Sequence, residues 1–186
     1  NNGHEKMNKL IPCIFILLFI QQINAQKHDY NWTIGDMYDV QILDFNVSPP
    51  DYYYWGNGTS ALISFPYYAA FSDSSGNLIY YTNGSHFYNK NNLLLAGSDL
   101  NTTYAIGRGG IVALPHPGKP NHSLVFRTNI KNPIMSQIDV KLLLMEIDHQ
   151  GDNGKGAIVQ DGQELFDGRI YPVQACKHGN GRDWWV

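Results

Sequence analysis

The segment Ala69–Asn89 reads AAFSDSSGNLIYYTNGSHFYN and consists of three short apolar and aromatic runs separated by two turn sequences. Asn83-Gly84 lies between hydrophobic runs, and this dipeptide is a strong hairpin signal because both central turn positions need a positive φ. The other turn, Asp73–Asn77, carries Gly76 for a similar backbone reason. The segment therefore predicts an antiparallel meander with strands at residues 67–72, 78–82 and 85–89.

The same kind of unit recurs further along the chain. A turn at 90–92 and a short strand at 93–96 complete the first unit, and residues 100–108 read as an inter-unit loop. The second unit has predicted strands at 110–115, 123–128, 139–148 and 157–160, with Asp161–Gly168 as loop and edge. A third unit has predicted strands at 170–175 and 182–186. Short strands at this spacing, without a helical period, are typical of a propeller blade or a sandwich sheet.

The segment 26–66 is expected to hold an N-terminal strand and an aromatic loop. Imperfect alternation predicts one strand over Asn31–Asn46, which Pro49-Pro50 ends because proline donates no ladder hydrogen bond. Asp51–Ser60 is first aromatic and then glycine-rich. Its four adjacent rings, Tyr52, Tyr53, Tyr54 and Trp55, are interpreted mainly as a loop packed over the core, with a glycan-stacking platform as the alternative.

Composition excludes one class of partner. Charged residues make up 16% of the 186-residue chain, against roughly 25% in typical domains, and the net charge is −3. Nucleic-acid binding needs clustered Lys and Arg to neutralise phosphates, and the sequence has no such cluster. We therefore expect no nucleic-acid partner.

Residues 7–25 read MNKLIPCIFILLFIQQINA and have the pattern of a secretory signal peptide. The apolar core Leu10–Ile20 is 11 residues long, whereas a membrane-spanning helix needs roughly 20. We expect cleavage before Gln26, a secreted or cell-surface location and no membrane span, with residues 1–6 as a non-native upstream extension. Loss of Cys13 with the signal leaves only Cys176, so the mature chain has no internal disulfide.

Common catalytic and metal-binding signatures are absent from the sequence. No HExxH, GxSxG or GxxxxGK[ST] motif occurs. His116 and His178 lie in Gly- and Pro-rich turns, where we expect solvated or capping side chains. Oxygen ligands for calcium cluster near Asp152, but Gly154 falls one place late for an EF-hand and Val159 occupies its twelfth position, which favours a hairpin turn. We assign no catalytic residue, cofactor or metal.

The order of several motifs resembles the N-terminal region of large secreted proteins of gliding, type IX-secreting bacteria. The motifs are LDFN (Leu43–Asn46), SDSSGNLIYYTNG (Ser72–Gly84), LPHPGKPN (Leu114–Asn121), GDNGKGAIV (Gly151–Val159) and CKHGNGRDWWV (Cys176–Val186). The resemblance implies a β-propeller, often followed by surface-domain repeats and a sorting domain, and it assigns these residues to blades.

The expected fold is all-β, with antiparallel meander units over 67–186 forming roughly two and a half blades of an incomplete propeller. Because the chain stops on the apolar run RDWWV, we expect a fragment whose partners include the remaining blades. The expected function is non-enzymatic adhesion or binding of a surface protein or glycan. The alternative is a glycan-active enzyme, a glycoside hydrolase or lyase, whose paired carboxylates cannot be assigned from sequence among Asp51, Asp73, Asp99 and Asp183.

Overall fold

The structure is a computed structural model that describes residues 27–35, 40–54, 69–82, 86–98, 106–130, 140–168, 173–179 and 183–186. The predicted signal peptide and upstream extension lie outside these ranges. Within them, the regular elements are strands apart from a single helical turn, α2 (Gly151–Gly154). The prediction of an all-β fold built from antiparallel meanders is confirmed. No helix in the described ranges has the length and apolarity to cross a membrane.

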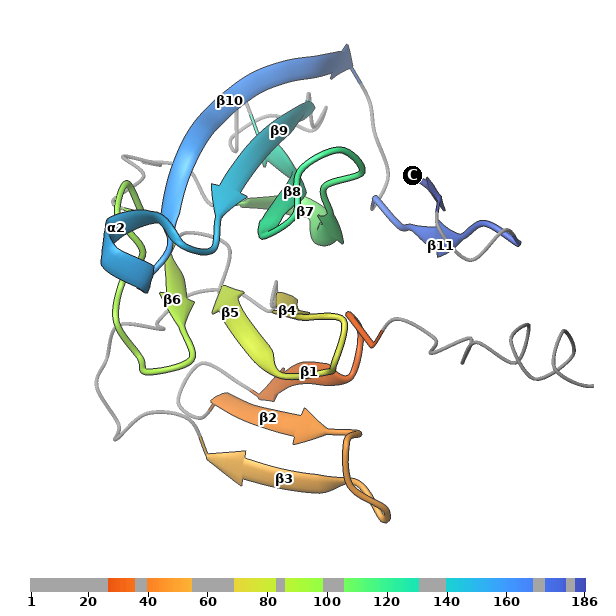
Figure 1. The fold of residues 1–186 in the computed structure, drawn as a ribbon. Coiled ribbons are helices and arrows are strands. Elements are labelled where there is room, and N and C mark those ends of the chain that lie inside the picture. The colour runs from red at the N-terminus through yellow and green to blue at the C-terminus, as the bar shows by residue number, and fades with distance from the viewer. Residues whose placement is uncertain are drawn as a thin grey trace, which may run out of the picture.

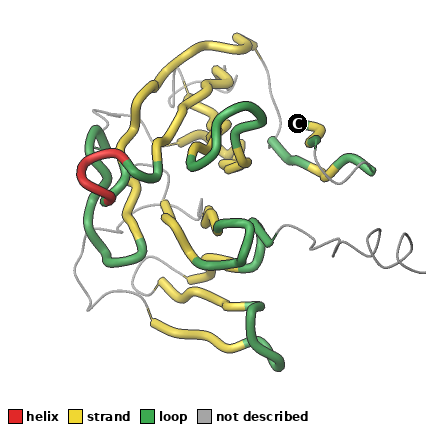
Figure 2. Tube along the Cα trace, in the orientation of Figure 1, coloured by secondary structure: helices red, strands yellow, loops and turns green. Residues whose placement is uncertain are grey.

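The strands form four antiparallel sheets, in each of which neighbours in space are neighbours in sequence (Figures 1 and 2). Sheet I contains β1 (Asn31–Gly35), β2 (Val40–Asp44) and β3 (Asp51–Tyr54). Sheet II contains β4 (Ala69–Ser72), β5 (Leu78–Thr82) and β6 (Phe87–Asn89). Sheet III contains β7 (Ile106–Pro115), β8 (His122–Ile130), β9 (Val140–Asp148) and β10 (Ala157–Gly168), and sheet IV is the hairpin of β11 (Cys176–Lys177) and β12 (Trp184–Trp185).

Sheet II lies between sheets I and III and contributes to both hydrophobic clusters of the fold (Figure 1). Successive strand residues face opposite sides, so Tyr80 packs toward sheet III and Tyr81 toward sheet I. The first cluster comprises Phe71, Tyr80, Phe87, Leu95, Val125, Met145 and Ile147, and the second comprises Ile42, Leu78, Tyr81 and Tyr88. Each such side chain contributes roughly 1.5–3 kcal/mol by leaving water.

Buried polar side chains tie the turn between β4 and β5 to sheet I. The Asn31 amide donates to Ser72 Oγ at 2.9 Å and to the carbonyl of Gly76 at 2.7 Å. Asn46 Nδ2 donates to the same Gly76 carbonyl at 2.6 Å. Gly76 has φ +92°, and a Cβ there would lie 2.1 Å from Asn46 Oδ1. The predicted turn therefore needs glycine both for its backbone conformation and for this close approach.

Three sequence-based expectations near the N-terminus and in the first unit were wrong. Asn31–Asn46 is two strands, because Asn31 pairs with Asp44 and Gly35 with Val40 in a hairpin. Residues 51–54 are the strand β3, since β2 supplies main-chain partners that a loop would lack. The segment 93–96 makes two isolated bridges, Tyr88 with Leu94 and Ala96 with Ala157, in place of the expected strand.

Sheet III also departs from expectation at its two outer strands. β7 begins at Ile106, inside the stretch predicted as a loop. β10 is an edge strand of sheet III, as expected of Asp161–Gly168, but these residues are strand and not loop. Register shifts accommodate their polar side chains against β9. Asp161 in this irregular stretch accepts two hydrogen bonds from Arg127 Nη2, at 2.8 and 3.0 Å. Residues 173–175 precede β11 and are not a strand, which corrects the described part of the predicted strand at 170–175.

Candidate binding face

One face of sheet I carries a row of apolar side chains in register across its three strands. Trp32 of β1 lies opposite Leu43 of β2, which in turn lies opposite Tyr52 of β3. The neighbouring row contains Ile42, which is fully buried against sheet II. Because adjacent rows face opposite sides, the row of Trp32 faces solvent, where Trp32 is 54% and Tyr52 58% exposed. We call Trp32, Leu43 and Tyr52 the aromatic row.

The indole of Trp32 is held in place by its surroundings. Its Nε1 donates a 2.8 Å hydrogen bond to the carbonyl of Asp29. The ring of Phe45 lies 5.1 Å from the indole, tilted by 57°. Two strand spacings, roughly 10 Å, separate the backbone positions of Trp32 and Tyr52. The row is therefore a fixed surface with an aromatic ring at each end and an aliphatic side chain between them.

The hollow beside Trp32 extends this surface toward sheet IV. A cavity of about 380 Å³ is lined by residues of β1, β4 and β7, and by Trp184 of the hairpin. Trp32 and Asp29 form part of its wall. A ligand lying on the aromatic row thus has space beyond the Trp32 end.

Tyr52 is the residue of the predicted run Tyr52–Trp55 that the structure places on the aromatic row. β3 places Tyr52 opposite Leu43, Tyr53 opposite Ile42 and Tyr54 opposite Gln41. Trp55 lies outside the described residues. Sequence reasoning missed Trp32 as a candidate residue. Trp32 lies opposite Leu43 only because residues 31–44 fold into a hairpin. The break in the hydrophobic alternation near Gly35 could have suggested that hairpin.

The carboxylates of β2 and β3, Asp44 and Asp51, do not lie on the face of the aromatic row. Asp44 and Asp51 are in register with each other and with Asn31, which is 3% exposed on the side of sheet I opposite the row. Asp44 Oδ1 accepts hydrogen bonds from the backbone and side-chain nitrogens of Asn46, at 2.7 and 2.9 Å. Asp51 Oδ1 accepts from the backbone of Tyr52 at 2.8 Å. Both carboxylates therefore cap local backbone.

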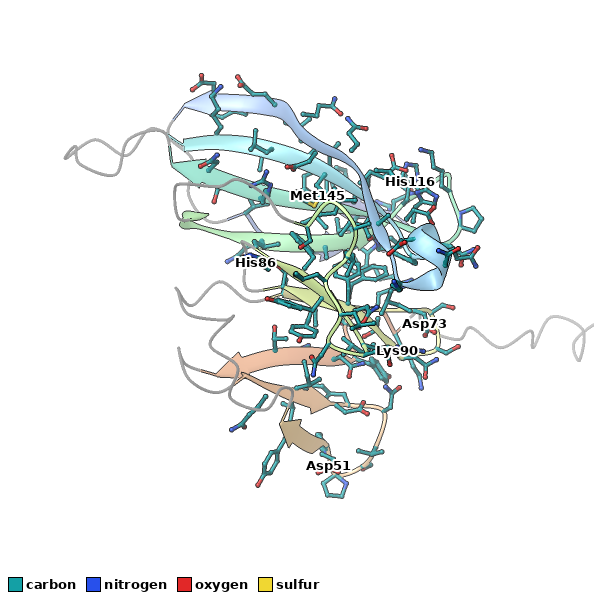
Figure 3. All side chains as sticks on the ribbon, turned by 90° about the vertical axis from the view of Figure 1, so that its left-hand side faces the viewer. Asp51, Asp73, His86, Lys90, His116 and Met145 are labelled. Atoms are coloured by element: carbon teal, nitrogen blue, oxygen red, sulfur yellow. The ribbon has the colours of Figure 1, made fainter. Side chains whose placement is uncertain are left out.

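The other aspartates considered from sequence are dispersed. Asp73 lies in the turn between β4 and β5, apart from Asp51 (Figure 3). Partial burial opposes ionisation of Asp73, but hydrogen bonds from Asn77, Ser75 and Gly76 outweigh it and lower the carboxyl pKa. Asp183 is exposed next to β12, and Asp99 lies outside the described residues. Among the described aspartates of this set, Asp51, Asp73 and Asp183, none is paired with another beside the aromatic row.

A second polar group lies between sheets II and III and was not foreseen from sequence. Ser123 Oγ is 2.8 Å from Tyr80 Oη and 3.0 Å from His149 Nε2. Burial lowers the pKa of His149 to about 4, so the ring is neutral near pH 7. A serine beside a neutral histidine resembles a nucleophile and its base, but Ser123 is fully buried and also bonded to Tyr80. The arrangement therefore acts as a structural link between the sheets.

The histidines of the turns have local roles. His116 Nδ1 accepts a 3.0 Å hydrogen bond from the backbone of Gly118, a capping contact at the edge of sheet III (Figure 3). Nearby, Lys119 Nζ and His122 Nδ1 each lie 2.7 Å from Glu146 Oε1, the histidine contact being poorly aligned for a hydrogen bond. The hydrogen bond from Lys119 lowers the pKa of Glu146. The ring of His178 lies 5.4 Å from that of Trp185.

The segment around Asp152, for which the sequence offered a calcium site or a hairpin turn, consists of α2 and the residues on either side of it. Asp148 Oδ1 accepts from the backbone of Gln150 at 2.9 Å, and Asp152 and Asn153 have positive φ. Across the described ranges, no group of three or more His, Cys, Asp or Glu side chains is placed to hold a metal ion. The segment is a tight turn between β9 and β10.

No protein-family model, curated protein sequence or solved structure matches this chain. The aromatic row is consequently the feature on which a functional proposal depends.

Proposed function

We propose that this chain is a non-enzymatic segment of an exported cell-surface protein and that it binds a glycan through the aromatic row. The observation that carries the proposal is the in-register exposure of Trp32 and Tyr52 on one face of sheet I. Sugar rings present apolar C–H faces that stack on aromatic side chains, while Trp and Tyr keep a polar group for water. Grouped exposed apolar side chains of this kind mark interaction sites.

The order of the sheets supports a propeller-type scaffold for this binding face. Each sheet is a meander of consecutive antiparallel strands, and sheets I, II and III pack in succession, as blades do. We propose that these sheets are blade-like units. Export rests on the signal pattern of residues 7–25, and exported protein is expected to begin at Gln26 on N-terminal sequencing; a retained Met7 would contradict it.

A glycan-active enzyme is the weaker alternative, because catalysis of glycosidic cleavage requires two carboxyl groups flanking the bond. Asp44 and Asp51, the carboxylates in register beside Tyr52, lie on the other face of sheet I. A ligand stacked on the aromatic row would therefore be separated from them by the sheet.

The proposal is tested by screening the full chain against an array of immobilised neutral and acidic glycans. We expect binding that is lost in a Trp32→Ala, Tyr52→Ala double variant, with circular dichroism verifying that the variant is folded. Trp185→Ala is the matched control, because Trp185 is 64% exposed in sheet IV, outside the aromatic row. Unchanged binding by the double variant, or no binding to any glycan, would refute the proposal.

A further inference from the structure

We infer that the ligand of the aromatic row is a neutral β-1,4-linked polysaccharide whose chain lies across the three strands of sheet I, an inference that rests on the proposed function.

The spacing of the two strand positions that carry the rings points to the linkage. Trp32 and Tyr52 occupy the two ends of one straight cross-strand row, two strand spacings or roughly 10 Å apart. In a β-1,4-linked chain each sugar is turned over relative to its neighbour, so every second ring presents the same face to a flat surface. One such disaccharide repeat is close in length to two strand spacings. The two rings therefore fit alternate sugars of the same chain, whereas a helically coiled α-linked chain does not keep this alternation.

The middle of the row suits the intervening sugar. Leu43 is only partly exposed, and it is less exposed than Trp32 and Tyr52 on either side of it. The sugar above Leu43 has the opposite face toward the sheet, so it needs no aromatic stacking partner and passes over this aliphatic side chain. Beyond Trp32 the chain can continue along the 380 Å³ hollow that Asp29 and Trp184 also line. The surface thus favours an extended polymer over a single terminal sugar.

The surrounding charges point to a neutral ligand. In the described ranges 27–35 and 40–54, the carboxylates are Asp29, Asp44 and Asp51 and the only ammonium is that of Lys27. Lys27 Nζ is positioned over the Tyr30 ring, 4.8 Å from its centroid. Asp44 and Asp51 lie behind the sheet, but Asp29 is exposed beside Trp32 and would repel a polyanionic glycan, which would lose affinity. A neutral chain avoids that cost and binds with little dependence on salt.

The test measures binding of the full chain to insoluble cellulose and chitin, to α-linked amylose and to anionic polygalacturonate, together with cello- and chito-oligosaccharides of increasing length. We expect binding to at least one of the two β-1,4-linked neutral polymers, little change in added salt, and tighter binding of longer oligosaccharides than of disaccharides. Trp32→Ala and Tyr52→Ala are each expected to weaken it about tenfold or more, as for central aromatic contacts, while Trp185→Ala stays near wild type.

The outcomes separate this inference from the proposed function. Binding to amylose or polygalacturonate that equals or exceeds binding to both β-1,4-linked polymers, and that Trp32→Ala still weakens, would overturn the inference and leave glycan binding in place. Absence of binding to every polymer would remove both. Equal affinity for disaccharides and longer oligosaccharides would contradict the extended, cross-strand arrangement.

Discussion

Replacing His149 with glutamine should change how the stability of the fold depends on pH. The imidazole packs against Phe71, with ring centroids 5.1 Å apart, and its Nε2 lies 3.0 Å from Ser123 Oγ. Burial is the main cause of its low pKa, the nearby His122 and His28 add to the effect, and Asp148 opposes it. Glutamine can still hydrogen-bond to Ser123 but cannot take up a proton.

The direction of the effect follows from proton binding in the two states. The pKa of His149 is about 4 in the folded chain against an ordinary value of 6.5, so the unfolded state binds the proton more readily. Stability is therefore fully retained above about pH 6.5, falls as the pH drops from there to about 4, and loses no more to this group below that. The whole interval corresponds to roughly 3 kcal/mol at 1.36 kcal/mol per pKa unit. Partial solvent exposure of the ring screens the effect, so we expect on the order of 1–2 kcal/mol.

The assay is urea denaturation of the full chain, followed by tryptophan fluorescence at several pH values between about 7 and 4. Wild type should lose about 1–2 kcal/mol more unfolding free energy across this range than His149→Gln. The carboxyl groups titrate in both proteins and cancel in the comparison. If the unfolding free energies of wild type and His149→Gln fall in parallel as the pH is lowered, the reasoning is refuted. A constant difference in stability between the two proteins at all pH values does not affect this comparison.

Two further substitutions test the packing of the fold. Met145→Ala should destabilise the fold by about 2–5 kcal/mol, because Met145 is fully buried between sheets II and III (Figure 3). The control Val159→Ala, at a 54% exposed site, should change the free energy of unfolding by no more than about 0.5 kcal/mol. Similar losses of stability in both variants would contradict the assigned core. Gly76→Ala should lower the free energy of unfolding by roughly 1–2 kcal/mol more than Gly162→Ala. Both glycines have positive φ, but a Cβ at Gly76 would lie 2.1 Å from Asn46 Oδ1, whereas a Cβ at Gly162 would meet no atom within 4 Å. Equal melting temperatures of the two variants would show that the Asn46 contact is unimportant.

Local sequence signals predicted the elements whose pairing partners are close along the chain. The predicted strand 78–82 coincides with β5, and 139–148 differs from β9 by one residue. Turn chemistry and alternating hydrophobicity determine such strands, so a short window of sequence contains the needed information. The hairpin of β1 and β2 was missed because the sequence between these strands contains no turn signal such as Asn-Gly. The same limitation hid β3, whose aromatic residues read equally well as a packed loop.

The candidate site depends on register, which sequence reasoning could not supply. Tyr52 was identified from a run of adjacent rings, and such a run does not give the register of its strand against the neighbouring strand. Its counterpart on the same face is Trp32, 20 positions earlier, and only the pairing of both strands with β2 brings them into one row. His149 and Ser123 were equally hidden, because their contact depends on how the turn after β9 folds back beside β8.

The central place of sheet II affects how the molecule folds and responds to ligand. Tyr80 and Tyr81 are consecutive residues, yet each belongs to a different hydrophobic cluster. Neither cluster can lose its order without disturbing the same short strand, so the two are expected to melt as one cooperative unit. A ligand held on sheet I would then slow opening of sheet III as well, and amide hydrogen exchange would register that protection far from the aromatic row.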